Sequence, residues 1–208
     1  MSAARAPKSE EMPLYELLIT LDGAHVQIDR RVLVPGQATL ADLHVVIQLA
    51  MGWQDCHLHA FTDRNGTTYG DSTMSELDFA EQSKFRVSEV LAEPGDEIEY
   101  EYDFGDSWHH RVELVQIRPD EGQGIRGLAC IGGHGMCPPE DCGGIWSYAE
   151  LCDSLADPRH RDHEEMVEWM GGIDEQPFDP SLFDPSAFDL EAANTAVRTL
   201  LGQSRPDS

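Results

Sequence analysis

The stretch from Ile98 to Ile117 constrains the fold more than any other part of the sequence, because apolar and polar residues alternate along both of its halves. Alternation with a period of two indicates a strand with one buried face. Between the halves, Gly105-Asp106-Ser107 has the residue types of a tight turn. The sequence therefore predicts a β-hairpin here, with His110 on its apolar face.

Weaker patterns of the same kind predict further strands at residues 14–21, 25–34, 57–61 and 67–69. Apolar residues at helical spacing predict a helix that begins after Thr39 and stops at Gly52. Thr39 and Asp42 have the spacing of a capping box, which satisfies two free backbone donors at a helix start. Residues 70–95 give no clear pattern.

The composition changes after the central hairpin. Residues 119–145 contain eight glycines and three prolines and are expected to form a loop. Helices are predicted over about 146–155, 163–170 and 185–201, the first with an apolar stripe of Trp146, Ala149, Cys152 and Leu155. A repeated Phe-Asp-Pro or Phe-Asp-Leu motif at residues 178–190 is expected to wrap the core with aromatic anchors.

These elements describe an α+β fold with a mainly antiparallel sheet built from β-hairpins, one early helix and a helical C-terminal region. We expect a single domain over residues 13–202, whose helical part starts near residue 146. A polar lead at residues 1–12 and a tail at residues 203–208 are expected to be disordered.

The charge balance limits the classes of partner that this protein is expected to bind. Lys and Arg number 14 against 39 Asp and Glu, which gives a net charge of −25. Nucleic-acid backbones need a basic surface, so a nucleic-acid partner is not expected, and a small molecule or a protein is. The sequence has no membrane-spanning run and no signal peptide, and its five cysteines fit reduced thiols in the cytoplasm.

The first candidate site joins His57 and His59 to Asp103, Asp106 and His110. On one strand face, the two histidines preceding the hairpin would be roughly 7 Å apart and would converge on one metal ion with the carboxylates. The same groups would suit acid–base catalysis in a metal-dependent hydrolase. The competing interpretation is that His110 is a core histidine and that the aspartates cap the turn.

The second candidate is a Cys3His zinc site formed by Cys130, His134, Cys137 and Cys142 on the glycine-rich loop. The spacing is irregular, and the alternative is a set of reduced, partly buried thiols. In the same loop, Glu140 and Asp141 would either point into a pocket shared with His110 or cap the helix near Trp146. Capping is favoured, because helix N-termini attract acidic groups. The four tryptophans are expected to be core or pocket-wall residues.

Three motifs resemble the plasmid pRiA4b ORF-3-like family. They are Gly52-Trp53 with His57-Leu58 and Phe61; Tyr102-Asp103-Phe104-Gly105-Asp106 with Trp108, His110 and Val112; and Pro138-Pro139-Glu140-Asp141-Cys142-Gly143-Gly144 with Tyr148. The resemblance covers about residues 14–194 and implies a fold of the kind described above. It implies little about activity, although some members are labelled transposon resolvases and one a repressor, which suggests a plasmid or mobile-element context.

A resolvase needs a nucleophilic serine among several arginines and a basic DNA-binding helix. This acidic chain has only two lysines, Lys8 and Lys84, and no such helix, so catalysis on DNA is rejected. The leading hypothesis is a binding or interaction protein. Its groove would be lined by Tyr102, Trp108 and His110 and rimmed by Asp103, Asp106 and Glu140. A metal-dependent hydrolase and a structural-zinc protein are the alternatives, with zinc as the candidate cofactor.

Overall fold

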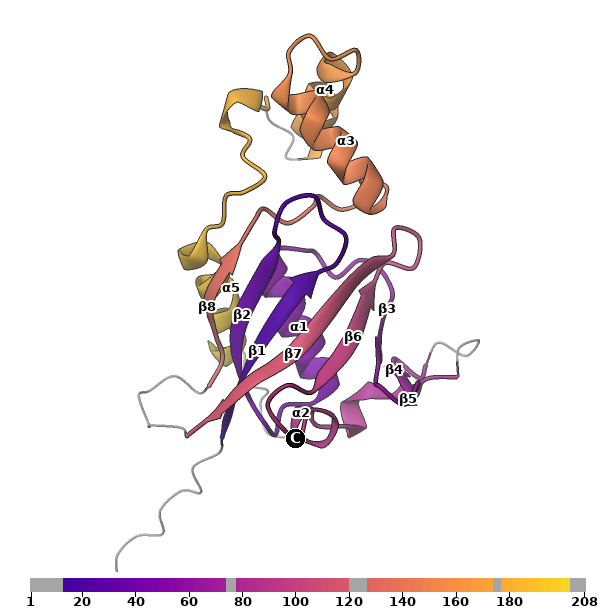
Figure 1. Cartoon of the computed structure of the whole chain (residues 1–208), viewed down its shortest axis with the longest axis vertical. Helices are drawn as coiled ribbons and strands as arrows, with labels where there is room; N and C mark the ends of the chain where they lie inside the picture. The colour runs from indigo at the N-terminus through magenta and orange to yellow at the C-terminus, as the bar shows by residue number, and fades with distance from the viewer. Residues whose placement is uncertain (1–12, 74–77, 120–126, 174–176, 203–208) are drawn as a thin grey trace, which may run out of the picture.

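The computed structural model describes residues 13–73, 78–119, 127–173 and 177–202. Its centre is an eight-stranded sheet in the order β5-β4-β3-β6-β7-β1-β2-β8 (Figure 1). Neighbouring strands are antiparallel except β4 and β5, which are parallel. The strands are β1 (Leu14–Leu21), β2 (Asp29–Pro35), β3 (His59–Thr62), β4 (Thr68–Gly70), β5 (Ala80–Glu81), β6 (Glu97–Tyr102), β7 (Trp108–Arg118) and β8 (Ala129–His134).

Five α-helices and two short 3-10 helices complete the described part of the chain. The α-helices are α1 (Leu40–Met51), α2 (Val87–Val90), α3 (Gly144–Ala156), α4 (His163–Ile173) and α5 (Leu190–Gly202); the 3-10 helices are η1 (Gln82–Lys84) and η2 (Pro180–Leu182). The predicted α+β fold class, with its mainly antiparallel sheet and helical C-terminal region, is confirmed.

The central hairpin consists of β6 and β7, joined by the tight turn that the sequence predicts. Tyr100 lies opposite His110, and Tyr102 lies opposite Trp108. All four side chains are buried, which confirms the apolar face and places His110 within it. β1 pairs on the other side of β7, so the hairpin is the middle of the sheet.

The predicted capping box at the start of α1 is confirmed. Asp42 N–H donates to the Thr39 side chain, and Thr39 N–H donates to the Asp42 carboxylate. Gly52 ends the helix with φ +106°, a left-handed conformation that glycine adopts without strain. The helix packs behind the sheet as Figure 1 is viewed, and α5 packs against α1 and β8.

The prediction that residues 119–145 form only loop was wrong, because β8 pairs with β2 along one edge of the sheet. Glycine is normally depleted in strands, which hid this element. A Cβ atom at Gly133 would come within 2.5 Å of the Asp29 carbonyl oxygen and 2.9 Å of the Phe188 ring. The glycine therefore permits close approach of β2 and of the C-terminal segment.

The C-terminal helices also differ in detail from the prediction. Trp146 does not join an apolar stripe, since 85% of it is exposed. The buried residues of α3 include Tyr148, Leu151, Cys152 and Leu155, which belong to the same hydrophobic core as the sheet. The helix predicted from about residue 185 starts only at Leu190, because Asp184 caps a separate turn before it and Asp189 caps the start of α5.

The expected disorder of residues 1–12 and 203–208 lies outside the described residues. Within the described ranges, no helix combines the length and the apolar character needed to cross a membrane.

An ion cluster surrounds a buried carboxylate on β1, and its two arginines are 40% and 42% exposed. Glu16 on β1 is 1% exposed and contacts Arg31, Arg118 and Gln116, with an Nη1–Oε1 distance of 2.5 Å to Arg31. Burial alone would raise the pKa of Glu16. The hydrogen bonds from Arg31 and Gln116 and the charge of Arg118 outweigh burial, so its pKa lies below the ordinary value.

We predict that Glu16→Gln lowers the free energy of unfolding by about 1–3 kcal/mol at pH 7, because hydrogen bonds to a charged group are lost. The folded-state pKa is depressed, so this contribution is complete above the unfolded pKa and disappears as pH falls through the folded pKa. Urea unfolding at a series of pH values should show the two proteins converging below pH 4. A constant difference down to pH 3 would contradict the assignment.

Candidate functional site

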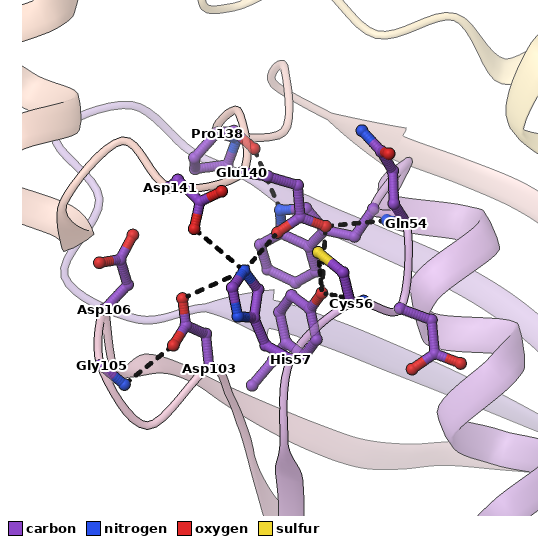
Figure 2. A network of polar contacts seen from close by, with 12 residues as sticks. Gln54, Cys56, His57, Asp103, Gly105, Asp106, Pro138, Glu140 and Asp141 are labelled. Carbon is purple, nitrogen blue, oxygen red and sulfur yellow. Dashed lines mark hydrogen bonds and ion pairs between the residues drawn. The ribbon is translucent and has the colours of Figure 1, made fainter. Parts of the chain in front are cut away.

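The candidate site lies where three segments meet at one end of the sheet. They are residues 53–57 before β3, the β6–β7 turn, and the loop of residues 138–144 before α3 (Figure 2). Figure 2 shows the side chains of Asp103, Glu140 and Asp141 converging on the ring of His57. Each of the three segments therefore supplies at least one polar group to the same small volume.

Both aspartates near His57 have a backbone conformation that few residues adopt. Asp103 has φ 55° and Asp141 has φ 57°, both in the left-handed region where aspartate is tolerated better than most side chains. Asp103 also caps its own turn, because its Oδ1 accepts from Gly105 N–H at 2.9 Å. Oδ2 of the same carboxylate points toward His57, so one residue shapes the turn and contributes to the site.

The 138–144 loop is attached to the hairpin turn by specific contacts. Asp106 Oδ2 accepts from Gly143 N–H at 2.9 Å, at the start of α3. A Cβ at Gly144, whose φ is +81°, would lie 2.7 Å from the Asp106 carbonyl oxygen, so a larger residue would push the loop away. On the other side, Trp53 Nε1 donates to the Pro138 carbonyl oxygen at 3.1 Å.

His57 is surrounded by carboxylates but forms no hydrogen bond with them. Its Nε2 is 3.1 Å from Asp141 Oδ1, 3.7 Å from Asp103 Oδ2 and 3.9 Å from Glu140 Oε2. Both Nε2 of His57 and Oε2 of Glu140 are buried atoms without a hydrogen-bond partner among the described residues. Buried polar atoms in proteins are almost always paired, so this pair needs an explanation.

The other oxygen of Glu140 is held firmly in place. Oε1 accepts from Gln54 N–H at 2.8 Å and from the Tyr102 hydroxyl at 3.0 Å. The Tyr102 oxygen in turn accepts from Cys56 N–H at 3.1 Å. Burial, together with the nearby Glu140, raises the pKa of the Tyr102 hydroxyl, and burial raises the pKa of the Cys56 thiol. Both groups therefore keep their protons at neutral pH.

His57 and His59 do not converge on one point as the sequence analysis expected. His57 precedes β3 and faces the carboxylates, whereas His59 stacks on His44 of α1 with ring centroids 3.4 Å apart. The prediction assumed one regular strand through both residues, but the strand begins only at His59. Asp106 likewise binds the loop backbone and lies outside the set around His57.

His110 and Trp108 are buried in the core and do not line an open groove. His110 is 1% exposed, packs edge-on against Trp53 at 5.2 Å, and has Nδ1 3.3 Å from the Tyr100 carbonyl oxygen. Burial lowers the pKa of His110 to about 4, so the ring is neutral at neutral pH. These observations match the core-histidine interpretation of this residue.

The four residues of the expected Cys3His site are not brought together. Cys130 is buried in β8, and His134 pairs with Asp29, its Nδ1 lying 3.0 Å from Oδ2. Burial raises the pKa of Cys137 and of Cys142, the latter to about 12, which keeps both as thiols. Among the described residues, no potential metal-ligand group contains more than one cysteine. The geometry fits the alternative of reduced, partly buried thiols.

The capping role favoured for Glu140 and Asp141 was wrong. The N-cap of α3 is Gly143, which has no side-chain cap, and the first turn of the helix contains no acidic residue. The two carboxylates face His57, and not His110. Residue spacing along the chain could not reveal this, because the orientation of the loop depends on its contact with the hairpin turn, which is distant in the sequence.

Sequence reasoning missed His44, Gln54, Asp55 and Cys56 as residues at or near the site. A signal existed only for His44, a polar residue at an apolar-spaced position of the mainly apolar helix α1. The three others lie in a connection whose backbone positions are set by tertiary contacts.

Comparison with known proteins places the chain in a family. A family model described as "Plasmid pRiA4b ORF-3-like protein" matches residues 13–192. The uncharacterised protein y4hQ of Sinorhizobium fredii (strain NBRC 101917 / NGR234) is 38% identical over 159 residues, 76% of this chain and 81% of that protein. The crystal structure of a protein of unknown function, MM3350 from Methanosarcina mazei Go1, is similar with a TM-score of 0.73 and 34% identity, covering 87% of this chain and 97% of that one. The chain therefore belongs to the plasmid pRiA4b ORF-3-like family.

Proposed function

We propose that this protein binds one divalent transition-metal ion through His57, Asp103 and Asp141, with Glu140 as a fourth ligand. The observation that carries the proposal is the buried His57 Nε2, which has no hydrogen-bond partner in the described part of the chain yet lies within 3.9 Å of three carboxylate oxygens. Such a metal site would give the binding function expected from the sequence a chemical basis.

The separations suit an ion between the groups. Metal–nitrogen and metal–oxygen bonds of about 2.0–2.2 Å place neighbouring ligand atoms of a tetrahedral site roughly 3.3–3.6 Å apart. The three distances from Nε2, 3.1 to 3.9 Å, need only small side-chain rotations to reach this range. The ligand atoms of His57, Asp103 and Asp141 already lie within 4.8 Å of one another, and those of His57, Glu140 and Cys56 form an overlapping group.

A protonated His57 is the competing explanation for the clustered negative charge. An imidazolium would donate a hydrogen bond to a carboxylate at 3.1 Å, and such charge-assisted bonds are strong. The pair with Asp141 has the distance but not the geometry of a hydrogen bond. A lone pair directed at an ion accounts for both the close approach and the missing bond.

The donor set favours particular ions. One imidazole with two or three carboxylates is an N/O set that suits Zn²⁺, Mn²⁺ or Fe²⁺. Because the Asp141 side chain is 73% exposed, solvent reaches this side of the cluster. A metal-bound water at that side would suit hydrolysis, which is therefore the second candidate function.

We predict that purified protein binds one equivalent of Zn²⁺ or Mn²⁺ and that His57→Ala weakens binding by about 100-fold or more, since removing a direct ligand costs at least as much as losing an outer-shell partner. Isothermal titration after chelator treatment measures both values. His109→Ala is the matched control, because this exposed histidine on the β6–β7 hairpin lies outside the cluster. Equal binding by both variants would refute the site.

A second pair of variants distinguishes the proposed site at His57 from the Cys3His site expected from the sequence. Asp103→Asn should release metal while Cys137→Ala retains it, because Cys137 belongs to no ligand group in the described structure. Metal content after gel filtration gives the answer. The reverse result would restore the structural-zinc alternative.

Metal binding should also stabilise the fold. At a free metal concentration 100 times Kd, linkage adds about 2.7 kcal/mol, which raises Tm by about 5–10 °C for a chain of this size. Thermal unfolding with and without chelator measures this shift. His57→Ala should show no shift, and an unchanged shift in that variant would place the ion elsewhere.

A further inference from the structure

A pocket of about 360 Å³ lies beside the proposed metal site, between α1, residues 55–59 and residues 79–82. Its volume falls in the range of small-molecule sites. His57 forms part of both the pocket wall and the carboxylate cluster. The pocket has two histidines of its own, His44 and His59, which the metal proposal does not use.

Hydrogen-bond geometry assigns the protons of His44. Gln48 Oε1 accepts from Asp55 N–H, so its Nε2 donates to the Tyr100 oxygen at 3.0 Å. The Tyr100 hydroxyl proton is then directed to His44 Nδ1 at 2.9 Å. His44 Nε2 must carry a proton, which it donates to Asp55 Oδ1 at 2.8 Å. His44 therefore has no free nitrogen for a second metal ion, although its ligand atoms lie near those of Asp55 and His59.

His59 has the opposite character and offers a hydrogen-bond acceptor. Its Nε2 is 3.0 Å from Gln82 Oε1, an oxygen that can only accept, so Nε2 carries the proton and Nδ1 has a lone pair. Within the described ranges, no group hydrogen-bonds to its Nδ1.

The remaining walls are negative and aromatic. Asp55, whose side chain is 53% exposed, and Asp71 line the pocket, and no lysine or arginine does. Hydrogen bonds with Thr73 lower the pKa of Asp71, so the carboxylate is charged at neutral pH. The rings of Phe79 and Phe104 are 6.4 Å apart, edge to face, and supply an apolar surface.

We infer that this pocket binds a small organic cation, an amidinium or ammonium group carried on an aromatic body. The N–H donors of the cation would bond to Asp55 and to Nδ1 of His59, and the body would pack against Phe79 and Phe104. An anion of the same shape would be repelled by both carboxylates. The inference goes beyond the metal site and does not depend on an ion at His57.

Titration calorimetry with four matched probes tests the inference on chelator-treated, full-length protein at pH 7.5. Benzamidine and benzylamine should bind at least about tenfold more tightly than benzyl alcohol, because a charge-assisted hydrogen bond is lost in the alcohol, and benzoate should not bind. Binding of benzoate as tight as that of benzamidine, or no binding of any probe, would overturn the proposal.

Two variants locate the binding. Asp55→Asn should weaken benzamidine binding by about tenfold, since it removes the charge and keeps an acceptor for His44. Phe104→Leu, which leaves the polar groups intact, should weaken it less, while Asp162→Asn in a different cleft should have no effect. Unchanged binding in Asp55→Asn would contradict the assignment. Zn²⁺ affinity, measured separately on the same proteins, shows whether the metal site survives independently.

Discussion

The contact between the 138–144 loop and the turn of the β6–β7 hairpin is the interaction on which the candidate site depends. It combines a hydrogen bond from Gly143 N–H to Asp106 with the close approach of Gly144 to the backbone of Asp106. Trp53 fixes the loop from the other side through the Pro138 carbonyl. This docking brings the carboxylates of the loop next to His57.

The carboxylate of Glu16 and the carboxylates around His57 have different partners. Glu16 is surrounded by Arg31, Arg118 and Gln116, so its negative charge is compensated within the fold. At the site, three carboxylates face a single imidazole, and within the described residues none of the three forms an ion pair with a lysine or arginine. The negative charge around His57 is therefore not compensated by arginine as it is at Glu16, which is consistent with the proposed binding of a cation there.

The segment from Asp55 to His59 connects the two proposed sites. His57 faces the carboxylates, whereas Asp55 and His59 line the pocket. The ring of His59 stacks on that of His44, which also lines the pocket. In this hydrogen-bond pattern, Nε2 of His44 donates to Asp55, whereas Nε2 of His59 donates to Gln82 and leaves Nδ1 of His59 as an acceptor. The two proposed sites are therefore adjacent and share His57.

The sequence by itself determined the local elements. Alternation along residues 98–117 defined the central hairpin, and the Thr39 and Asp42 spacing defined the start of α1, because both depend on neighbouring residues only. The family also followed from its motifs. Much of the candidate site followed as well, since His57, Asp103, Glu140 and Asp141 were all named from the sequence.

Only the tertiary structure decided how these residues combine. It separated His57 from His59, turned Glu140 and Asp141 from the helix start toward His57, and made His110 a core residue. It also placed a glycine-rich stretch in the sheet as β8, since Gly133 is needed where Asp29 and Phe188 approach. These outcomes depend on contacts between segments up to about a hundred residues apart, and such contacts leave no periodic trace in the chain.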